Sequence, residues 1–246
     1  MSEQVSLGVN GGVATIRLTR PEKKNALTAA MYDELVAALQ RYDADDAVRV
    51  VVFCGGNDFT AGNDLRDFLT LPADFENAPP LRFLRALRSF SKPVVAGVRG
   101  VSIGIGTTML LHCDAVLASE SASFALPFVK LGLVPEGAAS LLLPIVAGTA
   151  RASWYLMTGE KFDAAMAVEM GIAAKVVADA DLEQSVTDVA TTLAALPNGA
   201  LRAAKKLLHA PLDGMVSETM RREAEVFAAR LQSTEFREAA MKLLAR

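Results

Sequence analysis

Two stretches of the chain could each supply backbone N–H groups to a reacting oxygen. In the first, the apolar run Val48–Phe53 leads into Thr60-Ala61-Gly62-Asn63-Asp64. In the second, Val94–Val98 leads into Gly100-Val101-Ser102-Ile103-Gly104-Ile105-Gly106. Each pattern indicates a strand, a glycine-bearing turn and the start of a helix, where N–H groups are unpaired and the helix dipole is positive. If the two turns converge, they form an oxyanion hole, which stabilises negative charge that develops on an oxygen during a reaction.

Bulk composition restricts the kind of protein that carries these turns. Of the 246 residues, 52% are hydrophobic and 22% are charged, which is typical of a globular chain. The formal net charge of −3 gives no reason to expect nucleic acid or an anionic membrane as a partner. The two cysteines, Cys54 and Cys113, lack metal-ligand spacing, so we expect no metal site. We expect a cytoplasmic protein, since no signal-peptide pattern and no apolar run of membrane-spanning length is present.

The elements that must position the turns point to an α/β fold. Alternating residues around Asn10-Gly11-Gly12 predict a hairpin, and Thr28 is placed to cap an amphipathic helix that runs to about Tyr42. The residues Ile105–His112 are apolar on all sides, which predicts a central buried helix. Strands concentrate in the first half, and three mostly helical segments are expected after Val177.

Six segments, taken together and in order, resemble the crotonase (enoyl-CoA hydratase/isomerase) superfamily. They are Arg20-Pro21-Glu22-Lys23-Lys24-Asn25-Ala26-Leu27, Phe59–Leu65, Val98–Gly106, His112–Ala115, Leu131–Glu136, and Thr158–Glu160 followed by Met170–Ile172.

The resemblance implies a crotonase-like spiral of ββα units with a helical C-terminal region. Residues 1–190 would form the core with the acyl-CoA site, and residues 191–246 would build a homotrimer or a dimer of trimers. The substrate would be an acyl-CoA thioester of fatty acid metabolism. CoA would then be part of the substrate, and no separate cofactor is expected.

The resemblance also assigns roles to individual residues. The oxyanion donors would be the N–H groups of Asn63 and Ile105, in the two glycine turns described above. A phosphate could meet Lys205 or Lys206, although a solvated helix face is the alternative for either lysine. The acyl pocket would be shaped by the loop Leu71–Pro80 and the chain near Phe227 and Phe236. Contacts with CoA or substrate are implied for Lys24, Ala26, Ala61, Asp64, Leu65, Gly104 and Phe128.

The carboxylates that are present favour isomerisation over hydration. Hydratases of the superfamily use two glutamates, and this chain has Thr108 and Phe128 at those positions. The glutamate that remains is Glu136, as in the peroxisomal-type Δ3,Δ2-enoyl-CoA isomerases, where one carboxylate moves a proton from C2 to C4. We expect Ile103, Phe128, Leu131 and Leu133 to enclose Glu136 and to raise its pKa by desolvation.

Several alternatives remain open from the sequence. Glu136 could simply favour a helix N-terminus, which would leave a non-catalytic acyl-CoA-binding subunit. Another activity of the family, including enoyl-CoA hydration, is also possible. The pattern Gly100-Val101-Ser102-Ile103-Gly104 matches the nucleophile elbow of serine hydrolases, and an acid (Asp163, Asp179 or Asp181) and His209 follow it. A helix-end role for His209 and a packing role for His112 are the simpler interpretations.

Overall fold

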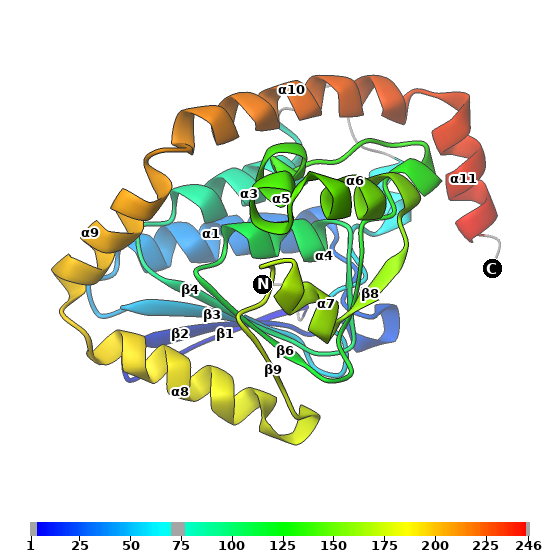
Figure 1. Cartoon of the computed structure of the whole chain (residues 1–246). Coiled ribbons are helices and arrows are strands. Elements are labelled where there is room, and N and C mark those ends of the chain that lie inside the picture. The colour runs from blue at the N-terminus through cyan, green and yellow to red at the C-terminus, as the bar shows by residue number, and fades with distance from the viewer. Residues whose placement is uncertain (1–3, 70–76, 245–246) are drawn as a thin grey trace.

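The computed structural model describes residues 4–69 and 77–244, and its centre is a six-stranded sheet (Figure 1). The strand order is β1-β2-β3-β4-β6-β9. The β1–β2 pair is antiparallel, as the hairpin pattern predicted, and the remaining pairs are parallel. The bounds are β1 Val5–Asn10, β2 Val13–Leu18, β3 Val50–Cys54, β4 Val94–Val98, β6 Ala115–Ser119 and β9 Lys175–Val177.

Helices cover both faces of this sheet. On one face α8 (Leu182–Ala195) packs on Val52 and Val95, and on the other α1 (Ala29–Ala44) and α3 (Pro79–Ser89) enclose the larger core. The strands β3 and β4 are continuous apolar runs because both of their faces are buried. Thr28 caps α1, as expected, by accepting a hydrogen bond from the N–H of Met31.

A second, three-stranded sheet was not foreseen. Its strands are β5 (Val101–Ile103), β7 (Ser123–Ala125) and β8 (Lys161–Asp163), in that order. The sequence indicated only a turn at β5, because a three-residue strand carries too little pattern to predict. Its pairing with β7, some twenty residues later, is a tertiary contact that determines the strand.

The segment Ile105–His112 differs from the predicted continuous helix. One α-helical turn, α4 (Ile105–Thr108), is followed by a 3-10 turn, Met109–His112. The second turn has the tighter 3-10 form, in which the N–H of Cys113 donates to the carbonyl of Leu110, three residues earlier. The chain then enters β6.

The remaining helices connect strands or follow the last strand, β9. Their bounds are α2 Leu65–Phe68, α5 Ala139–Ala147, α6 Thr149–Thr158, α7 Ala164–Glu169, α9 Asn198–His209, α10 Asp213–Leu231 and α11 Thr234–Leu244. Short 3-10 turns span Pro21–Lys23, Val129–Leu131 and Asp179–Asp181. Among the described residues, no helix has both the length and the apolar character needed to cross a membrane.

Four helices, rather than three segments, follow Val177 in the part of the chain that the structure describes. Residue 190, the proposed end of the core, lies inside α8, which packs on the main sheet. The helices α9, α10 and α11 then wrap around the molecule, with α10 lying across α5 (Figure 1).

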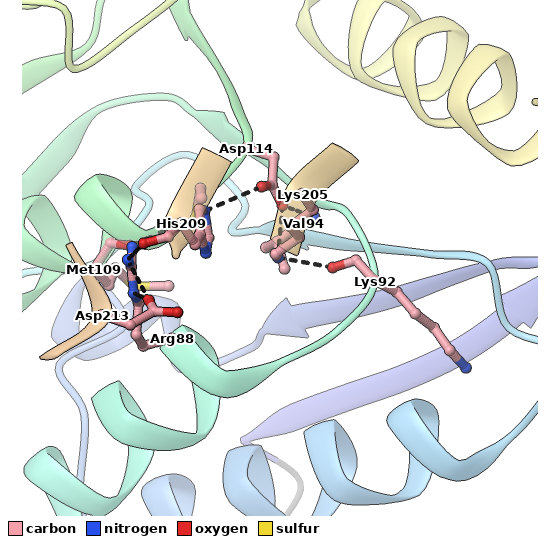
Figure 2. Close-up of polar contacts among 9 residues, drawn as sticks. Arg88, Lys92, Val94, Met109, Asp114, Lys205, His209 and Asp213 are labelled. Carbon is pink, nitrogen blue, oxygen red and sulfur yellow. Dashed lines mark hydrogen bonds and ion pairs between the residues drawn. The ribbon is translucent and has the colours of Figure 1, made fainter. Parts of the chain in front are cut away.

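A polar cluster anchors α9 to the rest of the protein (Figure 2). The ammonium of Lys205, whose residue is 6% exposed, donates to the Lys92 carbonyl at 2.8 Å and to Asp114 Oδ2 at 2.7 Å. Arg88 pairs with Asp213 at 2.7 Å, next to His209. The suggestion that Lys205 meets a CoA phosphate is therefore wrong, because its charge is engaged inside the protein; Lys206 is exposed.

Candidate active site

The two glycine turns meet, which is the condition that an oxyanion hole requires. The N–H of Thr60 donates to the Val101 carbonyl at 2.9 Å, and the N–H of Ile103 donates to the Thr60 carbonyl at 3.0 Å. A Cβ on Gly62 would lie 2.6 Å from the oxygen of Ile103, so the turns approach more closely than any side chain there would allow. Gly62 also has a φ of +88°, which favours glycine.

The N–H groups of Asn63 and Ile105 are left unpaired by this contact. Around Asn63, the Gly62 carbonyl accepts from Leu27 at 2.8 Å and the Asp64 N–H donates to Leu27 at 2.9 Å. Around Ile105, the Gly104 N–H donates to the Ala125 carbonyl at 2.9 Å. Within residues 4–69 and 77–244, the N–H groups of Asn63 and Ile105 themselves have no acceptor. Two donors are thus available at the edge of one cavity.

That cavity has a volume of about 940 Å³ and is bounded by both turns. Of the residues that the sequence suggested for the site, those on its wall are Ala26, Ala61, Asn63, Asp64, Leu65, Gly104, Ile105 and Phe128. Lys24 is not on the wall, and its carbonyl accepts the N–H of Ala61 instead; the neighbouring Lys23 lines the cavity.

Several charged side chains line the cavity. The cations are Lys23, Arg66, Lys130 and Lys242, and the acids include Glu235 and Glu238. Arg20 reaches the Ala26 carbonyl at 2.9 Å and Asp64 at 2.7 Å, which ties together two segments of the wall. Partial burial raises the pKa of Asp64, but the hydrogen bond and charge of Arg20, together with the backbone N–H groups of Arg66 and Asp67, outweigh burial and the pKa is lowered.

C-terminal helices form part of the cavity wall. Phe227 of α10 lines the cavity, as expected, and Leu243 of α11 lines it too. Phe236 does not line it but packs edge-on against Phe68, which also contacts Phe227 at 5.7 Å between ring centroids. The loop Leu71–Pro80, also expected to shape the pocket, lies mostly outside the described residues.

Glu136 is buried against α4, the helix that begins at Ile105. Only 2% exposed, it is not on the cavity wall, whereas Ile103, Phe128, Leu131 and Leu133 all are. Its Oε1 accepts a hydrogen bond from Thr108 Oγ1 at 2.6 Å, and its Oε2 has no partner in the described part of the chain. Burial raises the pKa of Glu136 to about 8; the Thr108 hydrogen bond opposes this rise and the charge of Glu223 adds to it.

Two further buried titratable groups lie near Glu136. His112 has its pKa lowered by burial to about 4, so the ring is neutral and its Nε2 donates to the Gly137 carbonyl at 2.8 Å. The Tyr32 hydroxyl donates to Asn63 Oδ1 at 2.5 Å. Burial and the nearby Glu136 raise the pKa of Tyr32, so it stays protonated. Tyr32 thus connects the surroundings of Glu136 with the first glycine turn.

Sequence reasoning located the two turns and Glu136 but missed the side chains that hold them. In the sequence, Thr108 stands out only because it occupies a position where hydratases have a glutamate. In the structure it is the hydrogen-bond partner of Glu136. Tyr32 and Glu223 carry no motif and lie far away along the chain, so only their contacts show them.

The structure does not assemble the serine-hydrolase arrangement. Ser102 is fully buried in β5, and its hydroxyl lies 3.5 Å from that of Thr107. His209 instead faces Asp114, 3.7 Å away, in the cluster at α9. Among the described residues, no group of three or more histidine, cysteine or acidic side chains could hold a metal ion.

Comparison with known proteins gives consistent matches over nearly the whole chain. The family model described as "Enoyl-CoA hydratase/isomerase" matches residues 8–244. "Enoyl-CoA delta isomerase 2" of Rattus norvegicus is 34% identical over 252 residues, covering 100% of this chain, which spans only 64% of that protein's length. "Probable enoyl-CoA hydratase" of Rhodobacter capsulatus is 36% identical and covers 96% of this chain and 93% of its own. The structure of Pseudomonas aeruginosa OdaA superposes with a TM-score of 0.97 at 41% identity, covering 100% of both chains.

Proposed function

The chain belongs to the enoyl-CoA hydratase/isomerase family, and from this premise we propose that it is an isomerase that moves the 3,4 double bond of an acyl-CoA to the 2,3 position. Enzymes of the family act on acyl-CoA thioesters, and the folds of its solved members match this one. One isomerase relative, the rat protein, is 34% identical to the chain.

The observation that carries the proposal is the state of Glu136. Its buried carboxyl has one oxygen bound by Thr108 and the other without a partner among the described residues, and its pKa is about 8. A proton shuttle needs this property, because the group must be able to accept and to return a proton near neutral pH. The positions that supply the two hydratase glutamates hold Thr108 and Phe128, neither of which is an acid or a base.

The proposed reaction moves one proton and consumes no water. The ionised Glu136 removes a proton from C2 of the 3-enoyl thioester, and the electrons of that C–H bond shift into a dienolate. The N–H groups of Asn63 and Ile105 stabilise the charge on the thioester oxygen. Protonated Glu136 then donates to C4, which leaves the double bond between C2 and C3.

A paired assay tests this function. The purified protein is incubated with medium-chain 3-enoyl-CoA and, separately, with 2-enoyl-CoA. Formation of 2-enoyl-CoA from the first, without 3-hydroxyacyl-CoA, supports the isomerase. No turnover of the first, with hydration of the second, would replace it by the hydratase activity that the name of the Rhodobacter capsulatus relative suggests. Binding without turnover of either would favour a non-catalytic acyl-CoA-binding subunit.

We further propose a cytoplasmic homotrimer or dimer of trimers. Large apolar side chains remain exposed on the single chain, notably Met157 on α6 and Leu207 and Leu208 on α9. Exposed apolar surface of this kind is typical of interfaces between subunits. Light scattering on the purified protein measures the number of subunits, and a monomer at micromolar concentration would contradict the proposal.

A further inference from the structure

The turn that carries Glu136 has an unfavourable backbone conformation. Gly137 and Ala138, the two residues after Glu136, both have left-handed backbones, with φ values of +71° and +58°. Glycine adopts this conformation freely, but alanine does so at a cost, so its surroundings must hold it there. Ala138 is also the N-cap of α5 and has no side chain that could accept the first N–H groups of that helix.

Glu223 supplies what the turn lacks. This residue belongs to α10 and is 7% exposed. Its Oε2 accepts the N–H of Ala138 at 2.6 Å, while its Oε1 accepts the N–H of Ser140 at 2.9 Å and the Ser140 hydroxyl at 2.6 Å. Three donors and no acceptor face the carboxyl in these contacts, so the ionised form is the one that this arrangement binds.

We propose that Glu223 is a positioning residue for Glu136, since its carboxylate accepts hydrogen bonds from both sides of the left-handed residue Ala138 and so fixes the turn that follows Glu136. This inference rests on the proposed isomerase function. It also assigns a role to α10, because docking of that helix completes the support of Glu136.

The other titratable groups near Glu136 do not carry charge. Tyr32 on α1 is protonated, and His112, in the 3-10 turn after α4, is neutral. Burial raises the pKa of Glu223, and the hydrogen bonds from Ser140 and Ala138 oppose that rise. When Glu223 is ionised, its charge raises the pKa of Glu136. Removal of this charge should lower the pKa of Glu136, whereas loss of the turn geometry should slow the reaction at every pH.

The variant Glu223→Gln tests both effects. The amide keeps the shape of the side chain but has no charge and one acceptor oxygen fewer. We expect kcat to fall about 10- to 100-fold, a range typical of a misplaced general base. The KM for 3-enoyl-CoA should change less than threefold, because the oxyanion turns do not contact Glu223. The midpoint of the kcat–pH profile should move to lower pH.

A matched control and a second variant separate positioning from folding. Glu225→Gln lies on the same helix, is exposed and pairs with Arg221, so it should behave like the wild type. In the double variant Glu223→Gln/Ala138→Gly, glycine tolerates the left-handed turn without the cap. We expect this variant to recover part of kcat while keeping the shifted midpoint.

A titration independent of turnover distinguishes this inference from the proposed function. Glutamate labelled with ¹³C at the carboxyl reports the pKa of Glu136 by NMR, assigned by comparison with Glu136→Gln. A lower pKa in Glu223→Gln supports the coupling even if the wild type isomerises nothing. An unchanged pKa, or a loss of activity in proportion to unfolded protein with the same midpoint, would overturn it.

Discussion

Replacing Thr108 by valine should make the base harder to ionise without removing it. Valine has nearly the shape of threonine but lacks the hydroxyl that donates to Glu136 Oε1 at 2.6 Å. A hydrogen bond to a charged group contributes about 1.5–3 kcal/mol, and one pKa unit corresponds to about 1.4 kcal/mol. Because the bond favours the carboxylate, its loss should raise the pKa of Glu136 by about 1 to 2 units from its value of about 8.

The consequence for the rate depends on pH. With a pKa of about 8, about one Glu136 in ten is ionised at pH 7. With a pKa of about 9 to 10, that fraction falls roughly 10- to 100-fold, and the rate of C2 proton removal falls with it. The loss should shrink steadily as the pH is raised towards 10, where both proteins approach the same ionisation.

The assay is the initial rate of 3-enoyl-CoA isomerisation between pH 6 and 10 for three proteins. These are the wild type, Thr108→Val and the control Thr108→Ser, which keeps the hydroxyl. A Thr108→Val rate reduced equally at every pH, or a midpoint that does not rise, would refute the assignment of Thr108 as the group that sets the ionisation of Glu136.

Four further predictions concern Glu136, the first glycine turn and Lys205. Glu136→Gln should retain acyl-CoA binding by calorimetry but lose isomerisation at least 100-fold. The pKa of Glu136 is about 8 in the folded protein and about 4.5 in the unfolded chain, so between these pH values the native wild type binds one more proton than the unfolded chain. Its unfolding free energy should therefore fall as the pH rises from 4.5 to 8. In urea titrations, Glu136→Gln should lack this decline. Gly62→Ala should separate the turns and abolish activity, because the added Cβ would lie 2.6 Å from the Ile103 carbonyl oxygen. In the control Gly56→Ala the added Cβ has no atom within 4 Å, so this variant should be as active as the wild type. Lys205→Met should lower the unfolding free energy by about 3 kcal/mol with an unchanged KM; an unchanged stability would contradict the buried ion pair.

The parts of the molecule that the sequence predicted are those determined by local pattern. The Asn10-Gly11-Gly12 turn produced the hairpin, and the Thr28 cap marked the start of α1. The two glycine turns indicated unpaired N–H groups because a strand and a helix start flank each one. The physical cause in each case lies within about ten residues of the feature.

The parts that escaped prediction depend on contacts between distant segments. Glu223 lies 85 residues after Ala138, and no periodicity in α10 distinguishes it from the exposed acids of the same helix. Lys205 lies 91 residues after Asp114 and resembled a solvated lysine until the fold buried it. The strand β5 is too short to show a pattern of its own. Tertiary contacts determined these outcomes, so the sequence alone left them open.

The contribution of α10 to the site has a consequence for synthesis. A ribosome makes the two glycine turns and Glu136 well before it reaches Glu223 and Phe227, and domains fold as their segments emerge. A nascent chain that ends before residue 223 would contain Glu136 but neither the carboxylate that holds its turn nor Phe227, which forms part of the cavity wall. The proposed active site is therefore completed late in translation, and a chain stalled before α10 would lack part of it.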